Sequence, residues 1–329
     1  VRLRIPAVLL LTLLTVSACG QAAQEPLELK ELRIAYDSGV DIGKAPSLLA
    51  WERMRDYGYE IIPVFFPDSV TAVQAVLAGE VDIGNADPVA VILANQAGQD
   101  FRIFALENGN QFAMVTPSSI TDPAQLSGKR VAYHSPGSMT RGLAFLAAET
   151  YGFEPEWVVI EGSEVRAEAL LSGQIDATVI DYENVVNVLL QAPGEYHVLI
   201  SFADQFPGLM GNGFFARAGY IEENPEVIEA MIESLLLTYR RVNDDPDYLF
   251  TQAPKFLPGI NEDPEKLRQI VDAYIGFNVW DSNGGFTAEA AGLTVDLYVE
   301  VGDLEVPAEF ETWAVLEPMN NVLERIGRR

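Results

Sequence analysis

Cysteine and histidine are almost missing from this sequence. Its 329 residues include one cysteine, Cys19, and two histidines, His134 and His197. A single cysteine can form neither an intramolecular disulfide nor a cysteine-based metal cluster. The chain also has no His-Glu-x-x-His motif and no paired Cys and His at metal-ligand spacing, which argues against a zinc or thiol enzyme. We therefore expect no metal site and no cofactor.

Basic residues are scarce as well. The chain contains 21 lysines and arginines against 48 aspartates and glutamates, for a formal net charge of −27. So acidic a protein does not suit a nucleic acid or an anionic membrane surface as a partner. Because 49% of the residues are hydrophobic, the chain is not disordered, and its length is sufficient for two domains with sizeable cores.

Familiar catalytic motifs are missing too. The segment Gly39–Ala45 faintly resembles a phosphate loop, but its glycines have the wrong spacing and Ala45 stands where Ser or Thr is required. Ser138 follows a glycine, yet the G-x-S-x-G nucleophile elbow is not present. Helix caps and solvated side chains explain the many carboxylates better than a catalytic pair does. An enzyme is therefore the least favoured interpretation.

The N-terminal segment has the pattern of an export signal. Two arginines precede an apolar run, Ile5–Val16, which is too short to span a bilayer and is followed by small residues and then Cys19. This arrangement predicts a signal peptide over residues 1–18, cleavage before Cys19, lipid on its thiol, and a polar tether over residues 19–30. The alternative is an ordinary secretory signal with an incidental cysteine.

Three short segments of the first half recur later in the same order. The spacing between partners is nearly constant, at 94 to 102 residues. The pairs are Ile34–Ser38 with Val131–Ser135, Leu77–Asp82 with Leu171–Asp176, and Gly109–Phe112 with Gly211–Phe214. Each match alone is weak, but together they predict two similar lobes.

Within each lobe the hydrophobic pattern predicts strands that alternate with helices. The expected strands are 32–36, 60–65, 81–84, 129–133, 157–160 and 175–180. The expected helices begin near Pro46 and Ser138 or follow the capping residues Ser69, Asp87, Ser163 and Asp181. Such alternation gives mainly parallel sheets that are covered on both faces. The predicted fold is therefore α/β, with two doubly wound sheets and a ligand cleft between them.

The repeat also sets the expected domain boundaries. Residues 31–115 and 213–329 are assigned to lobe one, and residues 116–212 to lobe two. The expected crossings between the lobes are Gln111–Thr116 and Asn212–Arg217, with hinges near Thr116 and Asn212. Helices in the C-terminal part, up to residue 276, are expected to pack back on lobe one.

Four segments resemble the NMT1/THI5-like and sulfonate-, nitrate- and taurine-type ABC substrate-binding proteins. They are Leu32–Tyr36, Ala72–Gly84, Leu126–Val131 and Ala169–Ala177. The resemblance implies a periplasmic-binding-protein type II fold that closes on a small-molecule ligand, with an ABC permease and its ATPase as partners. Together with the N-terminal motif, it leads us to expect a monomeric, exported receptor that is anchored to the membrane by lipid at Cys19 and is not an enzyme.

The ligands of this family include sulfonates, nitrate, thiamine-precursor pyrimidines and riboflavin. The pyrimidine branch usually has a Trp-x-Pro-Asn-like stretch after the first strand, which the segment Tyr36–Ile42 lacks. The THI5 synthases use a Cys-rich motif, and a chain with one cysteine does not match it.

Candidate ligand-binding residues are those expected near the cleft at strand ends, helix starts and crossings. They are Tyr36, Asp37, Asp41, Phe66, Asp68, Asn85 and Asp87 in lobe one, Asn110, Met210 and Asn212 at the hinge, and Ser135, Ser138, Met139, Thr140, Glu161, Asp181 and Tyr182 in lobe two. Each has a structural alternative, because several of these polar residues can cap a helix and Tyr36 can belong to the core.

This residue set is rich in aromatics, carboxylates and amides, with only Lys44 and Arg141 as expected cations. It favours a flat heteroaromatic ligand that stacks on Tyr36 and Tyr182 and donates hydrogen bonds to carboxylates and amides. Riboflavin is the first expectation and a thiamine-precursor aminopyrimidine the second. The alternative is an organic anion, namely an aliphatic sulfonate, taurine or nitrate, held by main-chain N–H groups at helix ends.

Overall fold

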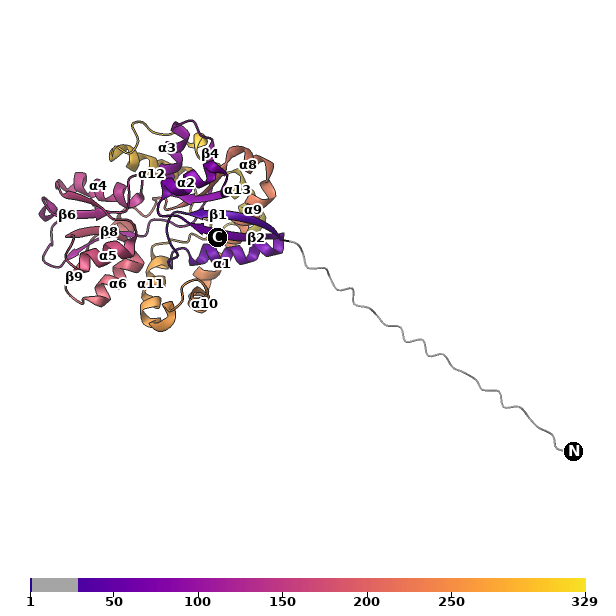
Figure 1. Cartoon of the computed structure of the whole chain (residues 1–329), viewed down its shortest axis with the longest axis horizontal. Coiled ribbons are helices and arrows are strands. Elements are labelled where there is room, and N and C mark those ends of the chain that lie inside the picture. The colour runs from indigo at the N-terminus through magenta and orange to yellow at the C-terminus, as the bar shows by residue number, and fades with distance from the viewer. Residues whose placement is uncertain (2–28) are drawn as a thin grey trace.

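The computed structural model consists of two lobes joined side by side (Figure 1). The structure describes Val1 and residues 29–329. The expected signal peptide, the lipid-bearing Cys19 and nearly all of the expected tether therefore lie outside the described residues. Among the residues that are described, the helices include none of the length and hydrophobicity that a membrane span requires.

Lobe one is built on a five-stranded sheet in the order β2-β1-β3-β10-β4. Strand β1 pairs in parallel with β2 and β3, whereas β10 is antiparallel to both β3 and β4. Four strands thus run in one direction, and only β10 runs in the other. The bounds are β1 Lys30–Tyr36, β2 Tyr59–Phe65, β3 Ile83–Ala86, β4 Phe101–Leu106 and β10 Gly213–Arg217.

Lobe two repeats this topology in the order β7-β6-β8-β5-β9. Strand β6 pairs in parallel with β7 and β8, and β5 is antiparallel to β8 and β9. The bounds are β5 Phe112–Pro117, β6 Arg130–Tyr133, β7 Glu156–Val159, β8 Ala177–Asp181 and β9 Tyr196–Ser201. The predicted fold of two mainly parallel sheets is confirmed.

The repeated Gly-x-x-Asp element has the same structural role in both lobes. The carboxylate of Asp82 accepts a hydrogen bond from the main-chain N–H of Arg33, and that of Asp176 accepts one from the main-chain N–H of Arg130, each at 2.9 Å. Each aspartate therefore satisfies a main-chain donor of the lobe's central parallel strand. The motif therefore stabilises the equivalent strand in both lobes.

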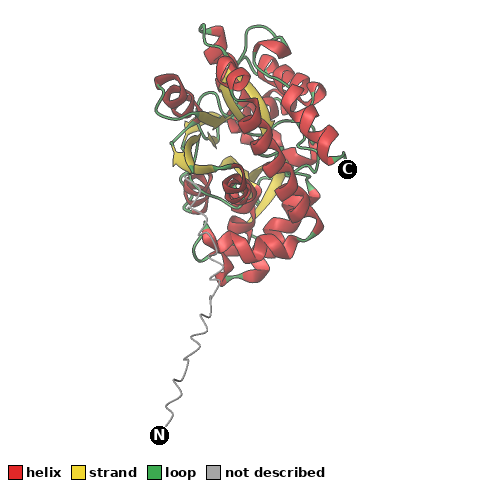
Figure 2. Cartoon of the chain, turned by 90° about the vertical axis from the view of Figure 1, so that its right-hand side faces the viewer, coloured by secondary structure: helices red, strands yellow, loops and turns green. Residues whose placement is uncertain are grey.

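Helices cover both faces of each sheet (Figure 2). Their bounds are α1 Ala45–Arg53, α2 Ser69–Ala78, α3 Pro88–Gln96, α4 Met139–Tyr151, α5 Ser163–Leu171, α6 Tyr182–Gln191, α7 Phe202–Gln205, α8 Ala218–Glu223, α9 Pro225–Asp244, α10 Pro246–Gln252, α11 Pro264–Gly276, α12 Ala288–Glu300 and α13 Glu317–Ile326. Short 3-10 turns occupy Met54–Tyr57, Pro123–Leu126, Ala253–Lys255, Ile260–Glu262 and Phe310–Thr312.

Two of the expected caps differ in the structure. Asp68 caps α2, because its carboxylate accepts from the main-chain N–H of Thr71 at 2.7 Å, and Ser69 is the first helical residue. Gly162 precedes α5, so Ser163 is likewise already inside its helix. Ser138 and Asp181 do accept hydrogen bonds from main-chain N–H groups in the first turns of α4 and α6.

The crossings between the lobes lie slightly before the expected positions. The boundary expected between residues 115 and 116 falls within β5, which pairs with β8 and β9 in lobe two along its whole length. The chain crosses instead at residues 107–111, and it returns between the end of α7 and the start of β10. Both segments meet in an antiparallel bridge between Gly109 and Met210.

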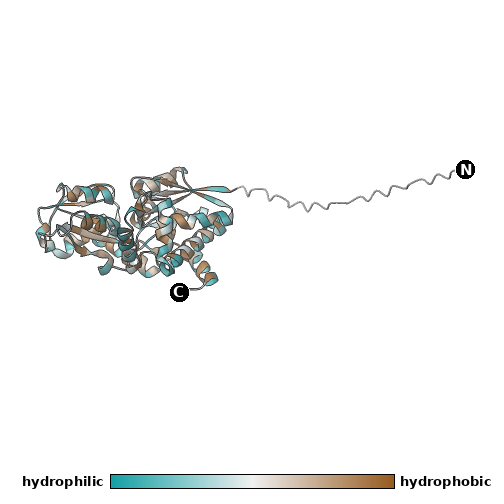
Figure 3. Cartoon of the chain, turned by 90° about the horizontal axis from the view of Figure 1, so that it is seen from below, coloured by the Kyte–Doolittle hydropathy of each residue, from teal (hydrophilic) through white to brown (hydrophobic). Residues whose placement is uncertain are grey.

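The C-terminal helices do not pack on lobe one alone. Helix α9 packs on α1, as expected, but α11 contacts α6 and α12 contacts α4, both of which belong to lobe two. Viewed from below, the two lobes lie next to each other with apolar residues gathered inside each (Figure 3). The C-terminal segment therefore connects the lobes a third time, through packing.

Candidate functional site

A cavity of about 330 Å³ lies between the lobes. It opens where β1, β3, β6 and β8 end and where α4, α5 and α6 begin, as expected for ligand sites in parallel sheets. Ten residues named from the sequence line it: Asp37, Asp41, Phe66, Asp87, Ser138, Met139, Thr140, Glu161, Asp181 and Asn212. These residues come from both lobes and from the second crossing.

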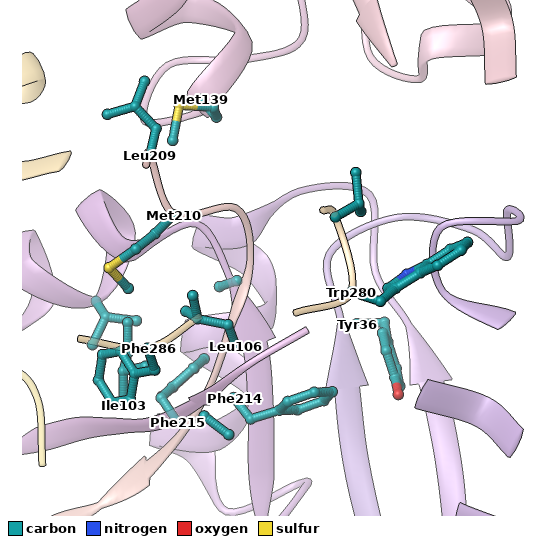
Figure 4. Packing of buried hydrophobic residues seen from close by; sticks show 14 of the residues in the cluster. Tyr36, Ile103, Leu106, Met139, Leu209, Met210, Phe214, Phe215, Trp280 and Phe286 are labelled. Atoms are coloured by element: carbon teal, nitrogen blue, oxygen red, sulfur yellow. The ribbon is translucent and has the colours of Figure 1, made fainter. Parts of the chain in front are cut away.

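Tyr36 does not reach this cavity, so the prediction that its ring stacks on the ligand is wrong. Its side chain is fully buried in lobe one, in an edge-to-face contact with Phe214 (Figure 4). Its hydroxyl accepts a hydrogen bond from the indole N–H of Trp51 at 2.6 Å and lies 3.3 Å from Ser47 Oγ. Because both faces of β1 are covered, the last residue of the strand packs into the core.

Tyr182 is also placed away from the cavity lining. Its ring packs edge-to-face against Phe277, with the ring centroids 4.7 Å apart. Since Phe277 directly follows α11, this contact joins lobe two to the C-terminal segment. The aromatic side chains that do line the cavity are Phe66 and Phe112.

Five other candidates support the site or its surroundings without lining it. Asp68 caps α2, and Asn85 accepts from the side-chain amide of Asn212 at 3.2 Å. Asn110 donates to the carbonyls of Phe202 and Phe206. The carbonyl of Ser135 accepts from Ser138 Oγ, and the N–H of Met210 donates to Thr294 Oγ1. Most of these bonds fix the crossings and the loop before α4.

The lobe-one wall of the cavity carries two buried carboxylates, Asp37 and Asp87. Asp37 is 7% exposed and is held by Ser69 Oγ at 2.6 Å and by the side-chain amide of Asn212 at 2.8 Å. Burial and the nearby charge of Asp37 together raise the pKa of Asp87 to about 8, against a hydrogen bond from Met139 that lowers it. The pair is therefore poised to accept a positive charge.

Lys44 adds a cation to the same wall, but this cation is already paired. Its Nζ lies 2.7 Å from Asp41 Oδ2. Burial acts to lower the pKa of Lys44, and the carboxylates of Asp41, Glu107 and Asp37 outweigh it, so that the pKa is raised. Arg141, the other cation expected near the cleft, forms an ion pair with Asp303.

The lobe-two wall contains a buried cation that was not expected, Arg166. The residue is 1% exposed, and its guanidinium donates to the carbonyls of Ile160 and Val179 and to Ser163 Oγ, at 2.8 to 3.3 Å. None of the ion pairs among the described residues includes it. Burial lowers its pKa to about 10, so the group stays charged at neutral pH.

A sequence signal for Arg166 does exist. The residue lies near the N-terminal end of α5, where the helix dipole disfavours a positive charge and an acidic residue is more usual. A cation at this unfavourable position, next to a predicted cleft, indicates that Arg166 has a role other than stabilising the helix.

The cavity lining also includes Ser38, Gly39, Val40, Lys44, Pro67, Asn108, Gln111, Phe112, His134, Gly162, Ser163, Glu164, Arg166 and Asn184.

Apart from Lys44, which is paired with Asp41, the buried charged residues that line the cavity divide it by sign. Lobe one contributes the carboxylates of Asp37 and Asp87, and lobe two contributes the guanidinium of Arg166. Glu161 and Glu164 also line the cavity, but both are exposed at its rim, where solvent screens them. The described residues include no cluster that could hold a metal ion.

Two hydrogen bonds close the cavity by joining the lobes directly. Asp87 Oδ2 of lobe one accepts from the main-chain N–H of Met139, at the start of α4, at 3.0 Å. In the opposite sense, Glu183 Oε2 of lobe two accepts from the main-chain N–H of Ile42 at 2.8 Å. Burial, helped by the charges of Asp181 and Asp41, raises the pKa of Glu183 to about 8, against the lowering effect of the hydrogen bond from Ile42.

Comparison with known proteins gives a family match. The family model described as "NMT1/THI5 like" matches residues 58–248. The taurine-binding periplasmic protein of Escherichia coli (strain K12) is 28% identical over 192 residues, which cover 57% of this chain and 59% of that protein. The chain thus matches less than two thirds of this relative's length.

Solved structures share the fold at lower identity. The periplasmic aliphatic sulphonate binding protein of Escherichia coli superposes with a TM-score of 0.66 and 20% identity, covering 86% of this chain and 91% of that one. The periplasmic nitrate-binding protein of Synechocystis PCC 6803 has a TM-score of 0.73 and 13% identity, covering 91% and 90%. The two-lobed architecture is therefore the one that periplasmic binding proteins have.

Proposed function

The chain belongs to the NMT1/THI5-like family, and on this premise we propose that it is the extracytoplasmic solute-binding protein of an ABC importer. In this role it captures a small molecule between its lobes and presents it to a permease and its ATPase. The match to a taurine-binding periplasmic protein supports this role. We further propose that the protein is exported, is anchored by lipid at Cys19 and acts as a monomer.

The proposed ligand is a small zwitterion that carries an acidic group and an amino group, such as an aminosulfonate. One observation carries this proposal: the cavity places the buried carboxylates of Asp37 and Asp87 on one wall and the unpaired guanidinium of Arg166 on the other. An ammonium group suits the first wall and an acidic group the second, because opposite charges attract strongly where solvent is excluded.

The organic-anion alternative is thus better supported than riboflavin or an aminopyrimidine. Tyr36 is buried in the core and Tyr182 packs on Phe277, so neither tyrosine on which the aromatic ligand was to stack meets the cavity. The named relatives bind taurine, aliphatic sulphonates or nitrate. The acidic inner wall explains why the amino group is included in the proposed ligand class.

Calorimetric titration with matched compounds tests this proposal. Taurine has an amino group and a sulfonate, ethanesulfonate lacks the amino group, and ethylamine lacks the sulfonate. We expect taurine to bind at least about tenfold more tightly than either, since a hydrogen bond to a charged group contributes about 1.5–3 kcal/mol. Riboflavin serves as the competing candidate. Binding of riboflavin without binding of taurine would overturn the ligand class and restore the aromatic one.

A further inference from the structure

His134 is a cavity residue that the proposed function does not yet use. It directly follows β6, in the loop that leads to α4, and it lines the cavity beside Arg166. Its main-chain N–H donates to Thr140 Oγ1 at 3.0 Å, which fixes the loop backbone at this point. The imidazole ring is therefore carried by a defined backbone and is half-buried in the lobe-two wall.

The hydrogen bonds of the ring determine its tautomer. Nδ1 lies 3.0 Å from the main-chain nitrogen of Gly162 and 3.4 Å from Nη1 of Arg166. Both neighbours can only donate, so Nδ1 must accept and cannot carry a proton. The proton of the neutral ring is consequently on Nε2, for which the described residues provide no hydrogen-bond partner.

The same surroundings keep the ring neutral. Burial lowers the pKa of His134, and the positive charge of Arg166 lowers it further, while Asp37, Glu161 and Asp68 act in the opposite direction. Protonation of Nδ1 would also break the hydrogen bond from Gly162 and place two donors against each other. The ring is thus a neutral donor with its proton at one defined atom.

We infer that His134 determines specificity in the cleft by presenting Nε2–H to an acceptor oxygen of the ligand's acidic group. The inference rests on the proposed function, because it assumes an acidic group next to Arg166. Arg166 then attracts the acidic group by its charge, which does not depend on direction. His134 adds one hydrogen bond with a defined direction. A ligand with a bare ammonium at this wall gains nothing from either residue.

Two substitutions separate this role from a structural one. In His134→Gln, the side-chain NH₂ can occupy the place of Nε2–H, so the donor to the ligand is kept. In His134→Asn, the shorter side chain can place its oxygen where Nδ1 accepts from Gly162, but no donor reaches the position of Nε2. If His134 only fixes the loop through Nδ1, Asn should be the better replacement. If His134 donates Nε2–H to the ligand, Gln should be the better replacement.

Taurine titrations of the full chain provide the first readout. We expect His134→Gln to bind within about threefold of the unaltered protein and His134→Asn to lose about tenfold or more, as for a lost hydrogen bond to a charged group. Equal loss in both variants, or better binding by Asn than by Gln, would overturn the inference. The variant His197→Gln is the matched control, because His197 donates to the carbonyl of Ile120 outside the cavity lining.

Nitrogen-15 NMR of the imidazole rings gives a second readout that needs no ligand. The chain has two histidines, so His197→Gln assigns the His134 signals directly. We expect an unprotonated Nδ1 and a protonated Nε2 at neutral pH, with the Nε2 proton shifting when taurine is added. A protonated Nδ1 would refute the assignment of the tautomer. If taurine does not bind to the unaltered protein, the proposed ligand class fails instead, and the spectrum still decides the tautomer.

Discussion

The carboxylate of Asp87 and the main-chain N–H of Met139 form a hydrogen bond of 3.0 Å across the cleft. Asp87 directly precedes α3 of lobe one, and Met139 is the first residue of α4 in lobe two. Asp87 makes no capping bond to its own helix, although Asp-Pro is a common helix start. Its side chain is used instead to hold the lobes together.

A second bond crosses the cleft in the opposite direction, from Ile42 N–H to Glu183. We expect Glu183→Ala to open the ligand-free protein, because loss of one hydrogen bond shifts the balance between closed and open forms by about 0.5–1.5 kcal/mol. Glu183→Gln retains an acceptor and should stay closed. Small-angle X-ray scattering would show a larger radius of gyration for the alanine variant alone.

The matched control is Glu164→Ala, which removes an exposed carboxylate at the rim of the cavity. Its radius should equal that of the unaltered protein. If the alanine and glutamine variants of Glu183 scatter identically, the bond to Ile42 does not hold the lobes together.

We also expect the carboxyl group of Asp87 to release a proton when the ligand binds. Its pKa is raised to about 8 by burial and by Asp37, so at pH 7 the carboxyl of the ligand-free protein is mostly protonated. An ammonium group placed beside it lowers the pKa, and the proton leaves. Calorimetry of taurine binding in buffers with different ionisation enthalpies should detect about one proton released per ligand at pH 7.

Asp87→Asn provides the control for this measurement. The amide can still accept from Met139 but cannot titrate, so the release should vanish while some binding remains. Uptake of a proton, or a release that persists in the asparagine variant, would show that another group is responsible.

Much of the fold could be predicted because it depends on local signals. The repeated Asp82 and Asp176 satisfy the same main-chain donor in each lobe, and Ser138 and Asp181 cap the helices they precede. Each of these contacts involves residues close in sequence or a motif that occurs twice. Hydrophobic periodicity together with capping therefore sufficed for the two sheets.

The site was less predictable because its key contacts join distant segments. Tyr36 ends a strand that is buried on both faces, so periodicity could not tell which residue meets the cleft. Arg166 is held by carbonyls of Ile160 and Val179, and its burial depends on how β7 and β8 pack around α5. The bonds of Asp87 and Glu183 depend on the orientation of the lobes, which no short segment specifies.

Arg166 is expected to dominate recognition of the acidic group. Arg166→Met removes the charge at similar volume, and we expect taurine affinity to fall by about tenfold or more. Arg166→Lys keeps the charge but loses the planar fork, so its affinity should lie between those of the methionine variant and the unaltered protein. Isothermal titration calorimetry measures all three.

Because Arg166 also donates to buried carbonyls, the methionine variant should unfold at a lower temperature, and thermal unfolding has to be recorded in parallel. Ethylamine, which lacks an acidic group, is the ligand control. If the methionine variant loses ethylamine and taurine equally, the effect of the substitution is structural and Arg166 does not recognise the acidic group.

The lipid anchor gives a prediction about processing. Cys19 follows small residues and an apolar run, so Cys19→Ser should abolish lipid attachment. We expect the variant to be released from membranes or to remain uncleaved, as seen by membrane fractionation and mass spectrometry of the N-terminus. A serine variant that is processed and retained on membranes like the unaltered protein would contradict the lipid anchor.

Glu107 predicts how stability depends on pH. Glu107 is the first residue of the first crossing and is fully buried, with Ser47 Oγ donating to its carboxyl group at 2.7 Å. Burial raises its pKa to about 8, against the lowering effects of Lys44 and of the Ser47 bond. In the unfolded chain the pKa is near 4.3. Between these values the folded state holds a proton that the unfolded state has lost, so the free energy of unfolding decreases as pH rises.

The slope from one such group is at most about 1.4 kcal/mol per pH unit. Asp87 and Glu183 act in the same direction, so the contribution of Glu107 has to be isolated by difference. Glu107→Gln resembles the protonated acid in shape and cannot titrate. Urea unfolding at pH 5.5 and 7.5 should show that the loss of stability with rising pH is smaller in this variant. An equal loss in both proteins would mean that Glu107 is ionised when buried, with Lys44 compensating its charge.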